Sequence, residues 1–133
     1  FMEEDLEVDE IPQYWNRKME KYLKISPEND SEGCLQDIHW AHGGFGYFPT
    51  YSLGSVLSAQ IFEKVDSEID DLQKNITEGN FQSLKDWLRK NIHRHGKRYT
   101  TNELIKKSTG KPLSSRSYLE YIKRKYGKLY KID

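Results

Sequence analysis

The sequence predicts an all-α fold, and three observations support this prediction. Apolar residues recur every three or four positions through most of the 133 residues, as they do on one face of an α-helix. Glycine, proline and N-cap residues separate these periodic segments. No segment alternates apolar and polar residues with the period of two that is typical of a strand. We therefore expect a single helical region over residues 1–133, without internal repeats or a domain linker.

Two helices are expected in the first third of the chain. The first carries Ile11, Trp15 and Met19 on one face, and Pro12 suits its first turn. The segment "SPENDS" ends this helix and contains suitable N-cap residues for the next. We expect the second helix over about 32–40, ending in the glycines that follow.

A long helix is expected after Pro49, which can open it. Its apolar residues are spaced by threes and fours, so they form one stripe that should face the core. The stripe consists of Leu57, Ile61, Val65, Ile69, Leu72 and Ile76.

Three shorter helices are expected in the remainder of the chain. The first is amphipathic, is marked by Leu84, Trp87, Leu88 and Ile92, and extends up to Gly96. Thr100 and Glu103 form a capping-box pattern at the start of the second, which should stop at Gly110. The last helix covers 118–130 and carries several tyrosines.

The composition restricts the class of protein. Lys plus Arg and Asp plus Glu each number 21, so the formal net charge is zero, which argues against a dedicated nucleic-acid or membrane-surface protein. Only 35% of residues are hydrophobic, which is little for an independent domain and typical of a piece that packs on a larger partner. No apolar run approaches the roughly 20 residues of a membrane span, and we expect a cytoplasmic location. The opening "FMEED" indicates a cut end.

A basic segment, "RKNIHRHGKR", covers Arg89 to Arg98. One interpretation is a surface for an acidic partner or a phosphate backbone. The interpretation that we favour here is a helix C-terminus, where cations complement the helix dipole. His93 and His95 lie on different helix faces and would chelate a metal poorly.

The strip "GCLQDIHWAHGGFGYFPTY", from Gly33 to Tyr51, contains the residues most typical of a chemical site. His39 and His42 could share one helix face, but no further ligand lies at a supporting spacing for a metal. The glycines lack the Lys-Ser/Thr ending of a phosphate-binding loop. As the only cysteine, Cys34 excludes an internal disulfide or a cysteine zinc site.

Asp37 and His39 would lie about 200° apart on an α-helix, so we expect each to need its own partner. Gln36, His39, Trp40 and Gly43 would then share one face. That face could form a substrate pocket with a polar pair beside an aromatic wall. The alternative is a structural histidine beside a capping aspartate, and the residues alone favour it.

The strip from Gly33 to Tyr51 resembles a known family. Gly33, Gln36, Asp37, His39 and Trp40 reproduce the G-x-x-Q-D-x-H-W signature of the Taq-type thermostable zinc carboxypeptidases. The following "FGYFPTYSLG", the upstream "WNRKMEKYLKI" and the downstream "IHRHGKRYTTNELIKKSTGKPL" and "YLEYIKRKYGKLY" are similar to the same family. The resemblance covers essentially the whole chain.

The resemblance implies a larger enzyme. Members of this family are two-lobed, mainly helical, zincin-like and commonly dimeric, and they remove amino acids from peptides with a free C-terminus. Their zinc is held by H-E-x-x-H and a downstream glutamate, and this chain contains no H-E-x-x-H. We therefore expect a C-terminal fragment that has no metal ligands, is inactive alone and packs on the missing N-terminal part. The alternative is a stand-alone truncated homologue that serves as a non-catalytic helical interaction module.

The resemblance also implies roles for individual residues. By analogy with angiotensin-converting-enzyme-type peptidases, His39 and Tyr47 are expected to be catalytic, with Tyr51 as a reserve substrate contact. The expected remaining roles are substrate binding and orientation for Gln36 and Asp37, and structural positions for Gly33 and Trp40.

Overall fold

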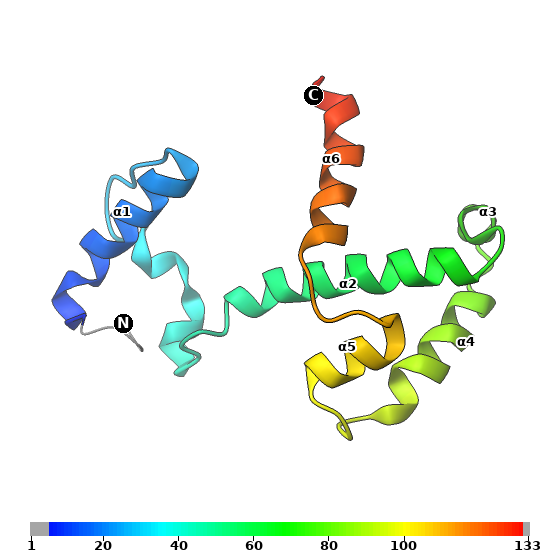
Figure 1. Cartoon of the computed structure of the whole chain (residues 1–133). Helices are drawn as coiled ribbons and strands as arrows, with labels where there is room; N and C mark the ends of the chain where they lie inside the picture. Colours follow the sequence, from blue (N-terminus) through cyan, green and yellow to red (C-terminus); the bar gives the residue numbers. More distant parts are fainter. Residues whose placement is uncertain (1–5, 132–133) are drawn as a thin grey trace. The chain divides into compact units, whose positions relative to one another are not determined.

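The computed structural model describes residues 6–131, which form helices and connecting turns without a strand, so the predicted all-α class is confirmed (Figure 1). The opening Phe1 and Met2, which we interpreted as part of a cut end, lie outside the described residues. The chain divides into two compact units, Phe1–Pro49 and Thr50–Asp133, and each is described by itself. Within the described range, no helix has the length and apolar character needed to cross a membrane.

The first unit contains one α-helix and three short 3-10 helices. η1 (Val8–Glu10) leads directly into α1 (Ile11–Leu23), which has a proline in its first turn as predicted. α1 ends where Lys24 adopts a left-handed conformation with φ 58°. η2 (Cys34–Gln36) and η3 (Ile38–His42) follow after a loop.

The prediction of an α-helix over 32–40 is wrong. Asp37 has φ −81° and ψ 85°, which is not helical and separates η2 from η3. The aspartate side chain caps η3 by accepting a hydrogen bond from the backbone N–H of His39. A short acceptor that bonds its own neighbouring backbone competes with helix formation in this way.

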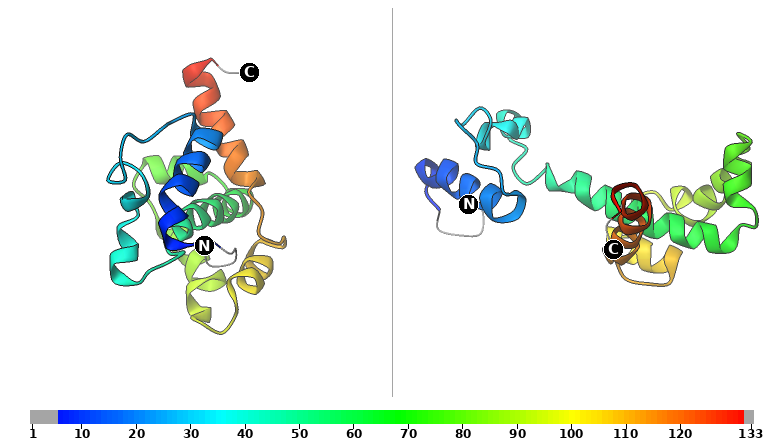
Figure 2. Two further views of the ribbon diagram at one scale, coloured as in Figure 1. Left: turned by 90° about the vertical axis from the view of Figure 1, so that its left-hand side faces the viewer. Right: turned by 90° about the horizontal axis from the view of Figure 1, so that it is seen from above.

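The second unit is built around the long helix α2 (Figures 1 and 2). Figures 1 and 2 show α4 and α5 on one side of α2 and α6 leaving on the opposite side. The capping box of Thr100 with Glu103 and the left-handed C-cap at Gly110 are confirmed. The elements are α2 (Pro49–Glu68), α3 (Leu72–Thr77), α4 (Gln82–Asn91), η4 (His93–His95), α5 (Thr101–Thr109) and α6 (Arg116–Tyr130).

The predicted stripe after Pro49 is not one continuous helix. The helix ends at Glu68, and Asp71 takes a left-handed conformation with φ 56° before α3 begins. This turn folds the later part of the stripe back, so that Val65 and Leu72 pack with Trp87 of α4 in a buried cluster. Partly buried side chains surround the cluster: Ile61, Ile69, Ile76, Leu84, Leu88 and Ile92.

A buried glutamine fastens the loop after α5 to α2. The Gln60 side chain is only 5% exposed. Its amide nitrogen donates to the Pro112 carbonyl at 3.0 Å and lies 3.2 Å from the Thr109 hydroxyl, while its carbonyl accepts from the backbone N–H of Ser114 at 3.0 Å. Both ends of the amide are therefore satisfied, as burial of a polar group requires.

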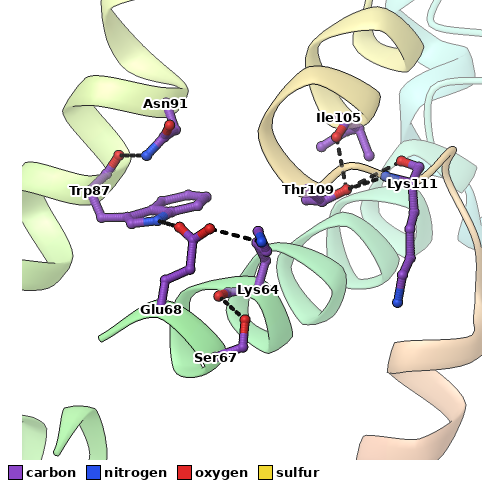
Figure 3. A network of polar contacts seen from close by, with 8 residues as sticks. All are labelled: Lys64, Ser67, Glu68, Trp87, Asn91, Ile105, Thr109 and Lys111. Atoms are coloured by element: carbon purple, nitrogen blue, oxygen red, sulfur yellow. Dashed lines mark hydrogen bonds and ion pairs between the residues drawn. The ribbon is translucent and has the colours of Figure 1, made fainter. Parts of the chain in front are cut away.

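A polar contact beside the buried cluster joins α4 to the end of α2 (Figure 3). The Trp87 indole N–H donates to the Glu68 carboxylate at 2.6 Å, and Lys64 Nζ pairs with the same carboxylate at 2.8 Å. The bonds from Lys64 and then from Trp87 lower the pKa of Glu68.

Replacing Gln60 with leucine should destabilise the second unit by about 1–3 kcal/mol, because the loop groups that it bonds lose their partner in a buried place. The measurement is urea unfolding of the chain. Gln73→Leu, at an exposed glutamine of α3, is the matched control and should change stability by less than about 0.5 kcal/mol. If both variants lose the same free energy of unfolding, the hydrogen bonds of the buried Gln60 amide do not contribute more than an exposed glutamine does.

Glu68 should make the free energy of unfolding depend on pH. Because its pKa is lowered by folding, its contribution is present at pH values above the ordinary glutamate value of 4.5 and is lost as pH falls through the folded value. Glu68→Gln should therefore reduce the free energy of unfolding near neutral pH and have a smaller effect in acid. A difference between the two proteins that is independent of pH would contradict this assignment.

Candidate functional site

The predicted strip contains a carboxylate–imidazole pair. Asp37 Oδ1 lies 2.7 Å from His39 Nδ1, and the same oxygen accepts the backbone N–H of His39 at 3.1 Å. Asp37 is buried, with 7% of its side chain exposed, and His39 is 21% exposed. One carboxylate oxygen therefore fixes both the backbone and the ring of the histidine.

This pair corrects the expectation that Asp37 and His39 cannot face each other. That expectation assumed an α-helix through both residues, whereas Asp37 is the N-cap of η3 and lies outside the helical conformation. The turn at Asp37 brings its side chain back over the first residues of η3. The alternative interpretation was a capping aspartate beside a structural histidine, and its first part is confirmed, because Asp37 caps η3.

Two aromatic rings lie against His39 from the segment just beyond η3. The Tyr47 ring is 5.0 Å from the imidazole between centroids, tilted by 39°, and the Phe48 ring is 5.5 Å away. Tyr47 is 52% exposed. The structure thus brings together both residues predicted to be catalytic, and it adds Phe48, which the sequence analysis missed because nothing in the local pattern distinguishes it from its aromatic neighbours.

The turn after η3 explains one of the glycines. Backbone N–H groups of Gly43 and Gly44 both bond the His39 carbonyl, the latter at 2.8 Å. A Cβ atom at Gly44 would lie 3.1 Å from that carbonyl oxygen and 3.2 Å from His39 Cβ. Any larger residue at this position would therefore press on the histidine.

The two residues predicted to be structural occupy packed positions. Trp40 contacts Trp15 of α1 edge-on at 6.2 Å and Phe45 at 6.0 Å between ring centroids. At Gly33, an added Cβ would lie 3.2 Å from the Asn16 side-chain oxygen. These contacts attach the strip to α1.

Gln36 is not brought to the pair. The Gln36 amide donates to the Ser31 carbonyl, so the predicted face shared with His39 and Trp40 does not form. Tyr51 lies in the first turn of α2, belongs to the second unit and is 60% exposed. Their assignment to substrate binding stays a prediction.

The described residues do not offer a metal site. Across residues 6–131, no group of three or more His, Cys, Asp or Glu side chains could hold a metal ion. Burial, with a smaller contribution from the Asp30 carboxylate, raises the pKa of the Cys34 thiol. This cysteine is therefore a poor nucleophile and a poor ligand.

The pair defines what His39 can do chemically. A carboxylate on Nδ1 keeps the proton on that nitrogen and orients the ring. His39 would then act on a substrate through Nε2. Tyr47, beside it, carries a hydroxyl that can donate a hydrogen bond.

An open groove with a volume of about 700 Å³ lies between α2 and α6, bordered by residues that include Phe62, Tyr121 and Arg124. None of the predicted site residues lines this groove. The candidate site therefore rests on the pair and its aromatic neighbours, not on this groove.

The family is shown directly by sequence: the model of the carboxypeptidase Taq (M32) metallopeptidases matches residues 1–126. The chain belongs to this family, and the predicted resemblance is confirmed.

Individual relatives agree with this assignment. Thermostable carboxypeptidase 1 of Pyrococcus furiosus is 42% identical over 123 residues, and carboxypeptidase 1 of Bacillus subtilis is 40% identical over 126 residues. These alignments include 92% and 95% of this chain and 25% of each relative.

Solved structures are similar as well. Metallocarboxypeptidase 1 of Trypanosoma cruzi is 39% identical with a TM-score of 0.84, over 92% of this chain and 26% of that one. The M32 carboxypeptidase of Deinococcus radiodurans is 38% identical with a TM-score of 0.87, over 96% of this chain and 26% of that one. The chain thus spans about a quarter of the length of its relatives.

Asp37→Asn should separate the two jobs of the carboxylate. The amide oxygen can still cap η3, so the fold should be kept, whereas the charge that holds the Nδ1 proton is lost. Nitrogen NMR of the imidazole should show the proton on Nδ1 in the natural chain and a shift toward Nε2 in the variant. An unchanged tautomer would mean that Asp37 only caps the helix. Asp37→Ala should also lose the cap and cost about 0.5–2 kcal/mol.

Proposed function

We propose that this chain is the C-terminal part of a zinc-dependent metallocarboxypeptidase that removes amino acids from the free C-terminus of peptides. The observation that carries the proposal is the Asp37–His39 pair with Tyr47 at its side, inside the G-x-x-Q-D-x-H-W signature. Family membership supports the reaction class, because the relatives are named as carboxypeptidases.

In this proposal His39 contacts the substrate through Nε2. Peptide hydrolysis places negative charge on the former carbonyl oxygen, and a donor directed at that oxygen stabilises the transition state. Asp37 accepts from Nδ1, and Nε2 can donate when the ring carries a proton on both nitrogens. The Tyr47 hydroxyl is a second donor, Tyr51 a reserve contact, and Gln36 and Asp37 orient the strip.

The metal belongs to the part of the enzyme outside this chain. When bound there, zinc supplies an activated water and polarises the carbonyl group. The described residues do not fit such a site, and the sequence lacks H-E-x-x-H. We therefore propose that this chain has no peptidase activity alone and needs the N-terminal part of the enzyme. The proposal further includes a single helical region over residues 1–133, a homodimer of the whole enzyme and a cytoplasmic location.

The alternative is a stand-alone, non-catalytic interaction module with the same helical scaffold. Its support is the absence of H-E-x-x-H from the sequence. The coding region upstream of Phe1 separates the two: an in-frame H-E-x-x-H favours the enzyme, and a start codon at Met2 favours the module.

Tyr47→Phe and His39→Gln, made in the whole enzyme, should each lower kcat more than they raise KM, because donors that act mainly in the transition state contribute little to ground-state binding. The expected loss is about 10²–10³ in rate, or roughly 2.7–4 kcal/mol for one such donor. Steady-state kinetics on a C-terminally free peptide provide the measurement.

His42→Gln is the matched control, since His42 lies in the same 3-10 helix, is exposed and is not part of the pair. It should leave kcat within about twofold, and Trp40→Phe should affect stability more than turnover. If Tyr47→Phe and His39→Gln also stay within twofold while the metal is retained, both residues are scaffold and the site assignment is wrong.

A further inference from the structure

One segment of the second unit, between α4 and the end of α5, has a large excess of positive charge. Between Arg89 and Lys111 the sequence has eight basic residues and a single acidic residue, Glu103, although the whole chain has 21 of each. The Glu103 carboxylate is already used, because it accepts the backbone N–H and the hydroxyl of Thr100, each at 2.8 Å. The segment therefore has one carboxylate for eight cations, and that carboxylate is held at the N-terminus of α5.

The helix dipole accounts for only part of this charge. Arg89 and Lys90 lie in the last turn of α4, where the dipole favours them. Arg94 and Arg98 lie beyond the end of α4, in η4 and in the turn before α5. The favoured interpretation from sequence, a helix C-terminus, thus leaves these residues unexplained.

These cations gather around one aromatic pair. The His95 and Tyr99 rings are 5.4 Å apart between centroids, and Lys107 Nζ of α5 lies 5.5 Å from the Tyr99 ring centroid. Desolvation and then the charges of Arg94, Lys107 and Arg98 lower the pKa of His95, as expected where several cations are close. We call Arg94, Arg98 and Lys107, with the two rings between them, the basic patch.

The turn holds the basic patch in place, and nothing described neutralises it. Backbone bonds link His95 to Ile92 and Arg98 to His95, each at 3.1 Å. The ion pairs found among residues 6–131 are elsewhere: Asp37 with His39, Lys64 with Glu68, and Arg116 with Glu120. Arg94 and Arg98 belong to the connection between α4 and α5, which is yellow-green in Figure 1, and Lys107 belongs to α5.

We propose that the basic patch binds an acidic segment of another polypeptide. Carboxylates match it because arginine pairs with them through two parallel hydrogen bonds and lysine adds a point charge. Between residues 82 and 118, all of them described, no large apolar side chain is exposed, so the patch has nothing to insert into a membrane. Tyr99 is half-buried between His95 and Lys107 and is not displayed for stacking on bases, which single-stranded nucleic acids require.

This inference does not depend on the proposed peptidase activity. The test is fluorescence anisotropy of the whole protein with a labelled peptide of alternating glutamate and serine, amidated at its C-terminus so that a carboxypeptidase cannot shorten it. The expected result is binding that weakens as salt rises. Combining Arg94→Gln, Arg98→Gln and Lys107→Gln should weaken it about tenfold or more.

The matched control removes the same charge from α6 through Lys123→Gln, Arg124→Gln and Lys128→Gln, and it should bind within about twofold of the natural protein. The exchange of Arg94 and Arg98 for lysine and of Lys107 for arginine keeps the charge and should retain most of the binding, which guards against a folding defect. Three outcomes would overturn the proposal: no binding by the whole protein, equal losses in the two glutamine triples, or tighter binding of an oligonucleotide of equal charge than of the acidic peptide.

Discussion

The first unit depends on the Asp37 carboxylate, which accepts hydrogen bonds from the backbone and the ring of one residue, His39. The backbone bond begins η3, so Asp37 decides where the helical conformation starts. The ring bond selects the Nδ1 tautomer and turns the imidazole toward Tyr47 and Phe48. Because both bonds end on one buried oxygen, loss of the Asp37 side chain affects the local fold and the histidine together, and only a substitution that keeps an oxygen acceptor without the charge can separate the two effects. This coupling gives a physical reason for aspartate at this place in the signature.

The sequence predicted those helices whose ends are set by local chemistry. The Thr100–Glu103 capping box, the glycine at position 110 and the proline near the start of α1 all act within a few residues, and the corresponding helix ends are as expected. The errors have a different cause. Asp71 is left-handed with φ 56°, a conformation that aspartate rarely adopts and that folding the stripe onto Trp87 favours here. Asp37 was expected in a helix because the capping bond that competes with helix formation spans only two residues, and helical periodicity does not detect it. The signature located the candidate site, but its geometry could not be read from helical periodicity.

The second unit has a small apolar core and a large apolar surface. Val65, Leu72 and Trp87 form its central cluster, while Leu119 and Leu129 of α6 are exposed. Buried polar groups such as the Gln60 amide link its elements where apolar contact is limited. A core of this size stabilises an isolated domain poorly. The chain spans a quarter of its relatives, and an enzyme part that covers α6 would account for the exposed surface. This consideration favours the fragment over the stand-alone module, because an interaction module would need to be stable before it meets its partner.

The Asp37–His39 pair and the basic patch differ in charge balance: the pair contains its own carboxylate, whereas the patch contains only cations. The two can therefore be tested separately. The Asp37–His39 pair is a short, partly buried contact of 2.7 Å, so it depends on geometry more than on ionic strength. In the basic patch, Arg94, Arg98 and Lys107 have no acidic partner among the described residues, and their mutual repulsion is relieved only by an external anion or by salt. Salt should therefore weaken binding at the patch far more than it changes the state of the pair. A salt titration that affects acidic-peptide binding while the His39 tautomer stays constant would assign the two properties to different residues.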